Sequence, residues 1–401
     1  MSKKILLKNI FLLGIFSVIF IDISGSFDFN LDKLFYKLDF IFGDLITIIP
    51  NLVELNTMDI NSAKISSSEK MGRVMNYPLI WVYIFNFVGK LINPVTFFGY
   101  SQILFYFIYA YYAQSKVTNI GILIILFCLL FSPPLLLALE RGNNDLTIFF
   151  LIMIGFLSSS FIRGLLLGIA IALKVYPVFL IIIYFLLNKL NRSFLFGLLL
   201  TSPLILFTML QLNIYIGNTE VSFSGNFGLL TMGLFFQKII TLLLQINMNK
   251  ILLIFLSVII FFVSVKALNH FLNDQVSKFL SKLSKNRKNF ELFILSTGLS
   301  VLIFLTFSSW AYRLVFLLPA TIIFIKEFNL SYHFLNFRNF LVFFLLTSPF
   351  LSTWVLLQTK ELLLNHYTWA VFAPITFFSF SLYFLILKKG IKVYKINFLK
   401  R

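Results

Sequence analysis

Long apolar segments alternate with short polar ones along almost the whole chain. A helix needs about 20 mostly apolar residues to cross a bilayer. Twelve segments approach that length, namely 9–23, 95–114, 119–139, 146–160, 162–174, 177–188, 194–212, 250–268, 291–307, 313–325, 339–358 and 368–387. This pattern predicts an all-α polytopic membrane protein with about twelve transmembrane helices, in a single integral membrane domain over residues 1–401.

Three of the middle segments are short, and polar residues or prolines interrupt them. The segments 146–160, 162–174 and 177–188 are broken by Arg163, Lys174 and Pro177. Charged groups and irregular backbone at membrane depth are tolerated only where they are buried in protein or line a cavity. We therefore expect this part of the chain to face other helices or a cavity rather than lipid.

The loops between the predicted spans differ in character. The first outer loop, 24–91, contains apolar positions at helical spacing over 31–42 and 45–52, which predicts interfacial amphipathic helices. Its last part, 78–91, is apolar but too short to span, so we predict an interfacial or re-entrant helix. The segment 269–290 predicts a basic cytoplasmic loop. The first apolar segment follows three lysines without a small-residue cleavage site, which indicates an uncleaved span.

Composition supports the membrane assignment. Hydrophobic residues make up 59% and charged residues 12%, about half the charged share of soluble proteins, which excludes a soluble multidomain enzyme. The net charge of +18 would suggest nucleic acid in a soluble chain. Here it indicates the positive-inside bias of a membrane protein, and we predict no nucleic-acid partner.

Charge placement predicts the orientation. Cytoplasmic termini place 21 of the 33 Lys and Arg residues inside and leave twelve charges of each sign outside. We therefore predict a multi-pass protein of the plasma (inner) membrane, with both termini cytoplasmic and the active site facing outside. One cysteine, Cys128, and three scattered histidines exclude an intramolecular disulfide and a Cys/His metal cluster.

Polar residues on the predicted outer side are the candidates for function. The segment Glu140, Arg141, Gly142, Asn143, Asn144 and Asp145 joins two very apolar helices. Charges at the membrane edge are costly and commonly mark function. The alternative is a tight turn in which Asp145 caps the next helix. A turn alone does not explain why Glu140 and Arg141 are adjacent.

Further cations fall on the same predicted side. Lys174 ends the fifth span and is either a snorkelling lysine or, with Arg141, part of a phosphate site. Arg313 begins the tenth span beside two aromatic residues, so it is either an interfacial anchor or a ligand residue. His366 precedes the last span, and a lone histidine is more often structural.

Several short motifs in order resemble those of the GT-C glycosyltransferases and, more narrowly, of glycosyltransferase family 87, the polyprenyl-phosphate-mannose-dependent mannosyltransferase-like membrane proteins. The resemblance covers roughly residues 40 to 320. The motifs are Gly43-Asp44, Asn76-Tyr77-Pro78-Leu79, the 140–145 segment, Gly164–Gly168 leading to Leu173-Lys174-Val175-Tyr176-Pro177, and Tyr312-Arg313.

The resemblance implies transfer of a mannose-like hexose or a pentose from a polyprenyl-phosphate carrier to a lipid or glycan acceptor at the outer face. It also implies an acidic base in the first outer loop, for which Asp44 fits best and Asp59 is the reserve. From propensity alone, Asp44 is a helix N-cap. A single displacement would invert the anomeric centre. We expect no metal and no other cofactor, since the loop shows no metal-binding acidic pair and the chain no nucleotide-binding signature.

The remaining site residues follow from the same resemblance and from charge. Cations would stabilise the leaving phosphate, and the candidates are Arg141, Lys174, Arg313 and His366. The candidates for substrate binding are Glu140, Asn143, Asn144, Asp145, Tyr77 and Tyr176.

Two other functions remain open. An envelope polysaccharide polymerase or ligase would have a similar number of spans, but usually a larger outer loop late in the chain, whereas here the largest comes first. A transporter would show a repeat relating two halves and polar residues at the membrane midplane, and we find neither pattern.

Overall fold

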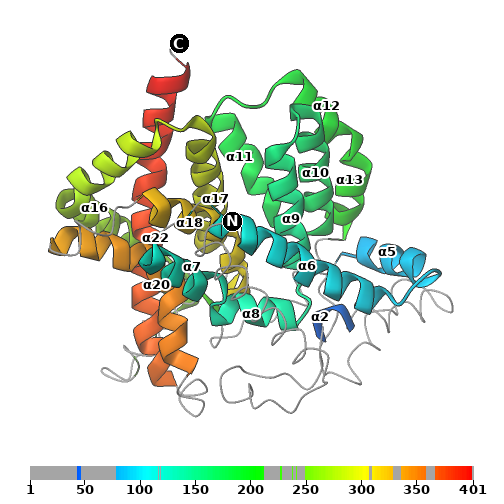
Figure 1. Ribbon diagram of the computed structural model, residues 1–401, viewed down its shortest axis with the longest axis horizontal. Coiled ribbons are helices and arrows are strands. Elements are labelled where there is room, and N and C mark those ends of the chain that lie inside the picture. Colours follow the sequence, from blue (N-terminus) through cyan, green and yellow to red (C-terminus); the bar gives the residue numbers. More distant parts are fainter. Residues whose placement is uncertain are drawn as a thin grey trace. The chain divides into compact units, whose positions relative to one another are not determined.

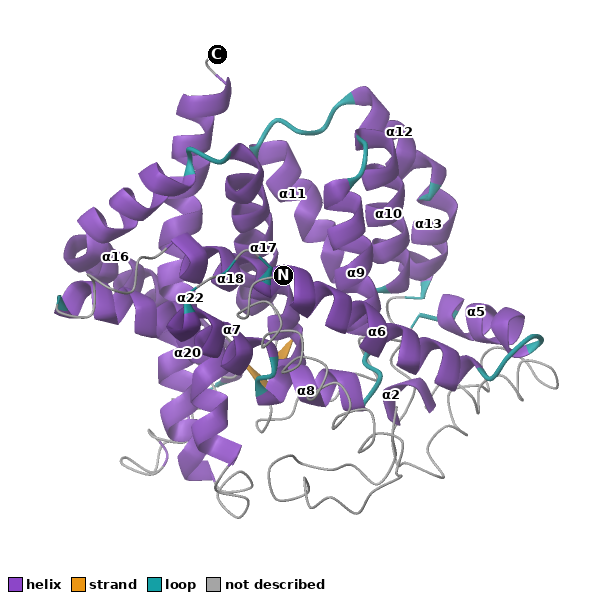
Figure 2. Ribbon diagram, viewed as in Figure 1, coloured by secondary structure: helices purple, strands orange, loops and turns teal. Residues whose placement is uncertain are grey.

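A computed structural model describes residues 43–46, 78–115, 117, 119–211, 226–227, 237, 241, 249–306, 309–327, 336–357 and 366–399. Helices dominate these residues (Figure 2), which confirms the predicted all-α class. They also include one short antiparallel pair, in which β1 (Asn226–Phe227) meets β2 (Ser309–Trp310). The predicted first span, most of the first outer loop, Asp59 and Tyr77 lie outside the described residues.

Fewer helices qualify as membrane spans than the sequence pattern predicts. Among the described residues, three helical stretches are long and apolar enough to cross a membrane: Leu252–Leu283, Arg287–Leu305 and Pro374–Phe398. The number rises to six if each of three bent helix pairs counts as one span. Several predicted spans are broken or shorter helices here, and the count of about twelve stays a prediction.

The chain divides into two compact units. The predicted single integral membrane domain stays a prediction. The first unit contains residues 1–118, 136–178 and 190–220. Its helices are α2 (Gly43–Ile46), α5 (Ile80–Gly89), α6 (Pro94–Gln114), the end of α8 (Pro133–Glu140), α9 (Asn144–Leu157), α10 (Ser160–Leu173), η2 (Tyr176–Val178), α12 (Arg192–Leu200) and α13 (Ser202–Leu210). The centre of this unit is α10, which packs against α9, α12 and α13 (Figure 1).

Glycines allow α10 and α12 to approach until their backbones touch. A Cβ on Gly164 would collide with the carbonyl of Phe194, and one on Gly197 would collide with the carbonyl of Phe161. A Cβ on Gly168 would overlap the side chain of Thr201. Small residues at this spacing are typical of close helix pairs in membranes, so the Gly164–Gly168 stretch forms the packing surface of α10.

A sharp bend joins α5 to α6. The two helices meet at 103° across a short break. Asn93 ends the break, since its side chain accepts hydrogen bonds from the amides of Val95 and Thr96, and Pro94 occupies the first turn of α6. With ten residues, α5 is too short to cross a bilayer. The predicted short helix over 78–91 is therefore present, and its interfacial position stays a prediction.

The second unit contains residues 119–135, 179–189 and 221–401. Its helices are α7 (Ile120–Leu130), α11 (Phe179–Leu186), α16 (Lys250–Leu283), α17 (Arg287–Thr306), η3 (Ala311–Phe316), α18 (Leu318–Glu327), α20 (Phe337–Leu357), α22 (His366–Tyr394) and η4 (Lys395–Leu399). Within this unit, α22 packs against α16, α17 and α20. Phe304 of α17 stacks on Phe380 of α22 with ring centroids 4.4 Å apart.

The predicted basic loop at 269–290 is mostly helix. Helix α16 continues to Leu283, and α17 begins at Arg287, which leaves only a short turn. The reason is a buried apolar stripe at helical spacing, formed by Leu272, Val276, Phe279, Leu280 and Leu283. The lysines that suggested a loop, such as Lys278 and Lys282, lie on the exposed face.

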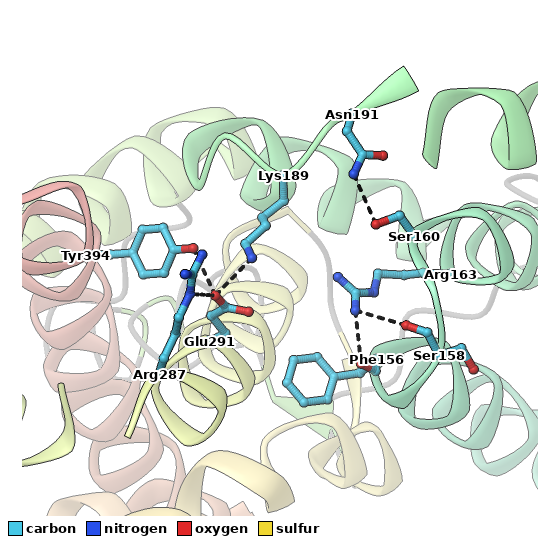
Figure 3. Close-up of polar contacts among 9 residues, drawn as sticks. All are labelled: Phe156, Ser158, Ser160, Arg163, Lys189, Asn191, Arg287, Glu291 and Tyr394. Atoms are coloured by element: carbon cyan, nitrogen blue, oxygen red, sulfur yellow. Dashed lines mark hydrogen bonds and ion pairs between the residues drawn. The ribbon is translucent and has the colours of Figure 1, made fainter. Parts of the chain in front are cut away.

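In this unit, a polar cluster ties together the ends of three helices (Figure 3). Glu291, near the start of α17, accepts from the side chains of Lys189 at 3.0 Å, Arg287 at 2.9 Å and Tyr394 at 2.9 Å. Lys189 follows α11, where Asn188 has a left-handed backbone that ends the helix. The cluster therefore fastens α11 and α22 to α17.

In the first unit, Arg163 closes the end of α9 (Figure 3). Its guanidinium donates to the carbonyls of Gly155, Phe156 and Ser158 at 3.1–3.2 Å. Carbonyls at the end of a helix lack the amide donors of a following turn. The guanidinium supplies donors here, in addition to the amide of Ser158, which donates to the carbonyl of Gly155. Arg163 thus explains the break between the predicted spans 146–160 and 162–174 as a capped turn.

Candidate active site

A three-residue junction joins α8 to α9. The amide of Asn143 donates to the carbonyl of Ala138, and the amide of Gly142 donates to that of Leu139. This pattern ends a helix with a left-handed residue, and Gly142 supplies it with φ of 59°. The side chain of Asn143 then accepts from the amide of Asp145 at 2.9 Å and caps α9. The cap is therefore Asn143, whereas the sequence analysis considered Asp145.

Asp44 meets this junction from far away in the sequence. Its Oδ1 accepts from Nε of Arg141 at 2.9 Å and lies 2.8 Å from Nη2 of the same guanidinium. Its Oδ2 accepts from Nδ2 of Asn143 at 2.5 Å. The backbone amide of Asp44 also donates to the carbonyl of Arg141 at 3.0 Å. These four contacts fix the carboxylate on the α8–α9 junction.

The contacts of Asp44 are buried. The side chains of Asp44 and Arg141 are 9% and 8% exposed, and Asn143 is fully buried. Removing two charges from water is costly unless the geometry is good and the remaining polar atoms are bonded. Here each carboxylate oxygen has a donor, and Asn143 serves twice, since its amide oxygen caps α9 while its nitrogen binds Asp44.

A second ion pair lies beside the junction, at the first turn of α9. Nζ of Lys174 is 2.6 Å from Oδ1 of Asp145, and the hydroxyl of Tyr176 donates to the same oxygen at 2.6 Å. Asp145 is fully buried in the first turn of α9, and Lys174 follows the last residue of α10. The ammonium of Lys174 also lies 5.9 Å from the ring centroid of Tyr176. The structure therefore brings Lys174, Tyr176 and Asp145 together, and their roles in binding stay predictions.

Two residues that the sequence analysis did not select support this second pair. The indole of Trp81 on α5 donates to the carbonyl of Leu173 at 3.1 Å. The hydroxyl of Thr208 on α13 donates to the carbonyl of Ala172 at 2.7 Å. The two carbonyls belong to the last two residues of α10, just before Lys174. A signal for Trp81 was available in Pro177, whose missing amide leaves the carbonyl of Leu173 without its helical donor.

The other predicted residues have different positions. Glu140 is the last residue of α8 and is half-buried. Asn144 is fully buried, and neither atom of its side-chain amide has a hydrogen-bond partner among the described residues. Arg313 lies half-buried in η3, and His366 is the first residue of α22, so both belong to the second unit. Their roles stay predictions, as do those of Asp59 and Tyr77.

The described residues offer little to a metal ion. Across the described ranges, no group of three or more His, Cys, Asp or Glu side chains is placed to bind one. The two ion pairs hold two carboxylates, Asp44 and Asp145, each beside a fixed cation. Such a set can accept a proton at one carboxylate and stabilise a developing anion at the cations.

The junction between α8 and α9 lies inside a segment that matches a known protein family. Residues 77–215 match the model of glycosyltransferase family 87. The matched segment contains the cations Arg141 and Lys174 together with Asn143, Asp145 and Tyr176, while Asp44 precedes it. The match confirms the resemblance drawn from the motifs, and it indicates a glycosyltransferase. Together with the apolar helices, family 87 also indicates a membrane protein. No curated protein matches the chain.

Proposed function

We propose that this protein transfers a sugar from a polyprenyl-phosphate carrier to a lipid or glycan acceptor at the outer face of the plasma membrane. The observation that carries the proposal is the buried contact of Asp44 with Arg141 and Asn143. An acidic residue from the first predicted outer loop thereby contacts two residues of the segment that matches glycosyltransferase family 87.

Asp44 is the proposed general base. The acceptor hydroxyl oxygen attacks the anomeric carbon, and its proton passes to the carboxylate of Asp44. The bond between the anomeric carbon and the phosphate oxygen breaks, and polyprenyl phosphate leaves. A single displacement of this kind inverts the anomeric centre. Arg141 and Asn143 fix the plane of the carboxylate, which keeps it aligned with one acceptor position.

Lys174 is the proposed phosphate ligand. The leaving phosphate gains negative charge as the glycosidic bond breaks, and a fixed cation stabilises that charge most in the transition state. An ammonium has three N–H donors, so Lys174 can keep its contact with Asp145 and still bind a phosphate oxygen. Arg141 is close in sequence to Asp145 and is the second proposed cation for the same phosphate.

Transfer in membranes tests the donor class and the roles. Membranes containing the protein are given a labelled polyprenyl-phosphate sugar, and transfer of label to endogenous acceptor is measured. We expect Asp44→Asn to lower the rate by about 100-fold or more, as for loss of a general base. Lys174→Met should lower it by a similar factor, as for loss of one oxyanion-stabilising donor.

Matched variants at exposed positions test whether the loss of a charge alone lowers transfer. Asp274 and Lys90 are exposed, so Asp274→Asn and Lys90→Met should leave transfer unchanged. Full activity in Asp44→Asn would exclude Asp44 as the base, and full activity in Asp59→Asn as well would exclude the reserve candidate. If wild-type membranes transfer label from a nucleotide sugar and not from the polyprenyl-phosphate donor, the donor class is wrong.

A further inference from the structure

The end of α10 lacks the donors that a continuing helix would supply. In an α-helix the carbonyl of residue i accepts from the amide of residue i+4, so Leu173 would require an N–H at position 177. That residue is Pro177, which has none, and a proline also disfavours helix at the residue before it. The helix accordingly ends at Leu173, and Lys174 has an extended backbone with φ of −164° and ψ of 128°.

Side chains from two other helices supply the missing donors. The indole N–H of Trp81 reaches the carbonyl of Leu173, and the hydroxyl of Thr208 reaches that of Ala172. Trp81 is 1% exposed and Thr208 is fully buried. A buried carbonyl left without a donor costs about 1–3 kcal/mol. The helix end is therefore closed by tertiary contacts rather than by water.

Trp81 is itself firmly placed. Its ring packs edge-on against Phe98 of α6 at 6.0 Å and against Phe85 of α5 at 6.4 Å between centroids. Phe85 and Phe98 stack on each other at 5.3 Å. The sharp bend between α5 and α6 makes this packing possible, since it turns both helices toward the same ring. The short helix α5 thus places the indole N–H of Trp81 against the last carbonyl of α10.

The position of the Lys174 ammonium depends on this closure. The peptide that links Leu173 to Lys174 contains the carbonyl bonded by Trp81, and the amide of Lys174 donates to Ala170 at 2.9 Å. Rotation of that peptide would swing the side chain away from Asp145, from which Nζ is now 2.6 Å distant. We propose that Trp81 and Thr208 are positioning residues for Lys174, acting through the last two carbonyls of α10. This inference rests on the proposed role of Lys174 as the phosphate ligand.

Two conservative variants remove the donors and keep the shape. Trp81→Phe loses the indole N–H, and Thr208→Val loses the hydroxyl. We expect each to lower kcat/KM for the polyprenyl-phosphate sugar about tenfold, the equivalent of one net hydrogen bond. Thr208→Ser retains the hydroxyl and should restore the wild-type value. Two controls should change little: Tyr83→Phe on the same helix α5, and Thr347→Val, whose hydroxyl bonds to Phe343 within its own helix.

A double-variant cycle distinguishes positioning from simple support of the fold. In a Lys174→Met background, Trp81→Phe and Thr208→Val should cause no further loss of kcat/KM, because the group that they position is absent. If they lower kcat/KM by the same factor with and without Lys174, they support the fold alone and the inference is wrong. If Trp81→Phe does not fold, Thr208→Val decides the question.

A second readout needs no substrate. Purified protein is treated with an amine-acylating reagent, and modification of Lys174 is quantified by mass spectrometry. The side chain of Lys174 is 13% exposed, so its labelling should rise in both test variants and remain at the wild-type level in the controls. Unchanged labelling in both test variants would overturn the inference. If wild-type membranes fail to use the polyprenyl-phosphate donor, the proposed function fails while this measurement still decides the positioning.

Discussion

The buried pair of Asp44 and Arg141 makes a prediction that separates stability from catalysis. Both side chains are less than a tenth exposed, and the guanidinium contacts one carboxylate oxygen through two nitrogens. Removing one partner leaves the other charge buried, which typically costs 3–5 kcal/mol. We therefore expect Asp44→Asn and Arg141→Met each to lower the free energy of unfolding by about 3 kcal/mol or more.

The double variant should behave differently. Asp44→Asn with Arg141→Met removes both charges, and the new amide oxygen can still accept from Asn143. Replacing a buried ion pair with uncharged groups is often neutral, so the double variant should recover at least about 2 kcal/mol of the summed losses. Transfer activity should stay low, because the proposed base and one proposed phosphate ligand are both gone.

Denaturant unfolding of purified protein in detergent measures the first effect, and transfer in membranes measures the second. The exposed pair of Lys282 and Glu327, 3.7 Å apart with side chains 51% and 26% exposed, is the control. Its double-variant coupling should be below about 1 kcal/mol. If the losses from Asp44→Asn and Arg141→Met simply add, the two side chains do not interact and the description of the junction is wrong.

Three further predictions concern backbone and packing. Gly142→Ala should destabilise the protein by about 1–2 kcal/mol, since a Cβ is unfavourable at its left-handed φ of 59°, and thermal unfolding measures this. Gly164→Ala should cost at least about 1–3 kcal/mol, because its Cβ would collide with the carbonyl of Phe194 and push α12 from α10; denaturant unfolding is the measurement. Glu291→Ala should cost about 1–3 kcal/mol by removing the acceptor of three side chains, and limited proteolysis should then cut the ends of α11 and α22 faster.

Each of these has its own control. Gly89→Ala places a Cβ 3.8 Å from Pro94, an ordinary contact, and should be neutral or slightly stabilising because alanine favours helix. A stable Gly164→Ala variant would contradict the close packing of α10 and α12.

Gly142→Asn should be milder than Gly142→Ala, since asparagine tolerates the left-handed conformation. Asp274→Ala, at an exposed position, controls for loss of a carboxylate, and equal proteolysis in both would count against the role of Glu291.

The sequence was sufficient to select much of the junction, because its residues break a strong apolar pattern. Arg141, Asp145 and Lys174 stand out as charges between apolar helices, and the structure places them near the ends of α8, α9 and α10. The turn chemistry of Gly142 was also readable. Apolar length, however, predicts one span per segment, and it cannot show the bends that divide 95–114 from its preceding helix or 194–212 at Thr201.

The partners within the junction could not be read from the sequence. Asp44 could have met any cation, and its choice of Arg141 and Asn143 depends on how the chain folds over a separation of 97 residues. The sequence also suggested Arg141 and Lys174 as phosphate ligands without showing that each lies against a carboxylate. Trp81 was missed because an aromatic residue in an apolar helix looks like packing until its N–H finds an acceptor 92 residues away.

Pro177 has a consequence for how this chain can change during evolution. Proline at position 177 lacks the amide that would bond the carbonyl of Leu173. The indole of Trp81, on another helix, donates to that carbonyl instead. Residues 81 and 177 should therefore vary together among related sequences. A relative with an ordinary residue at the position of Pro177 has an amide available there, and it should be free to replace the tryptophan with a residue that donates no hydrogen bond.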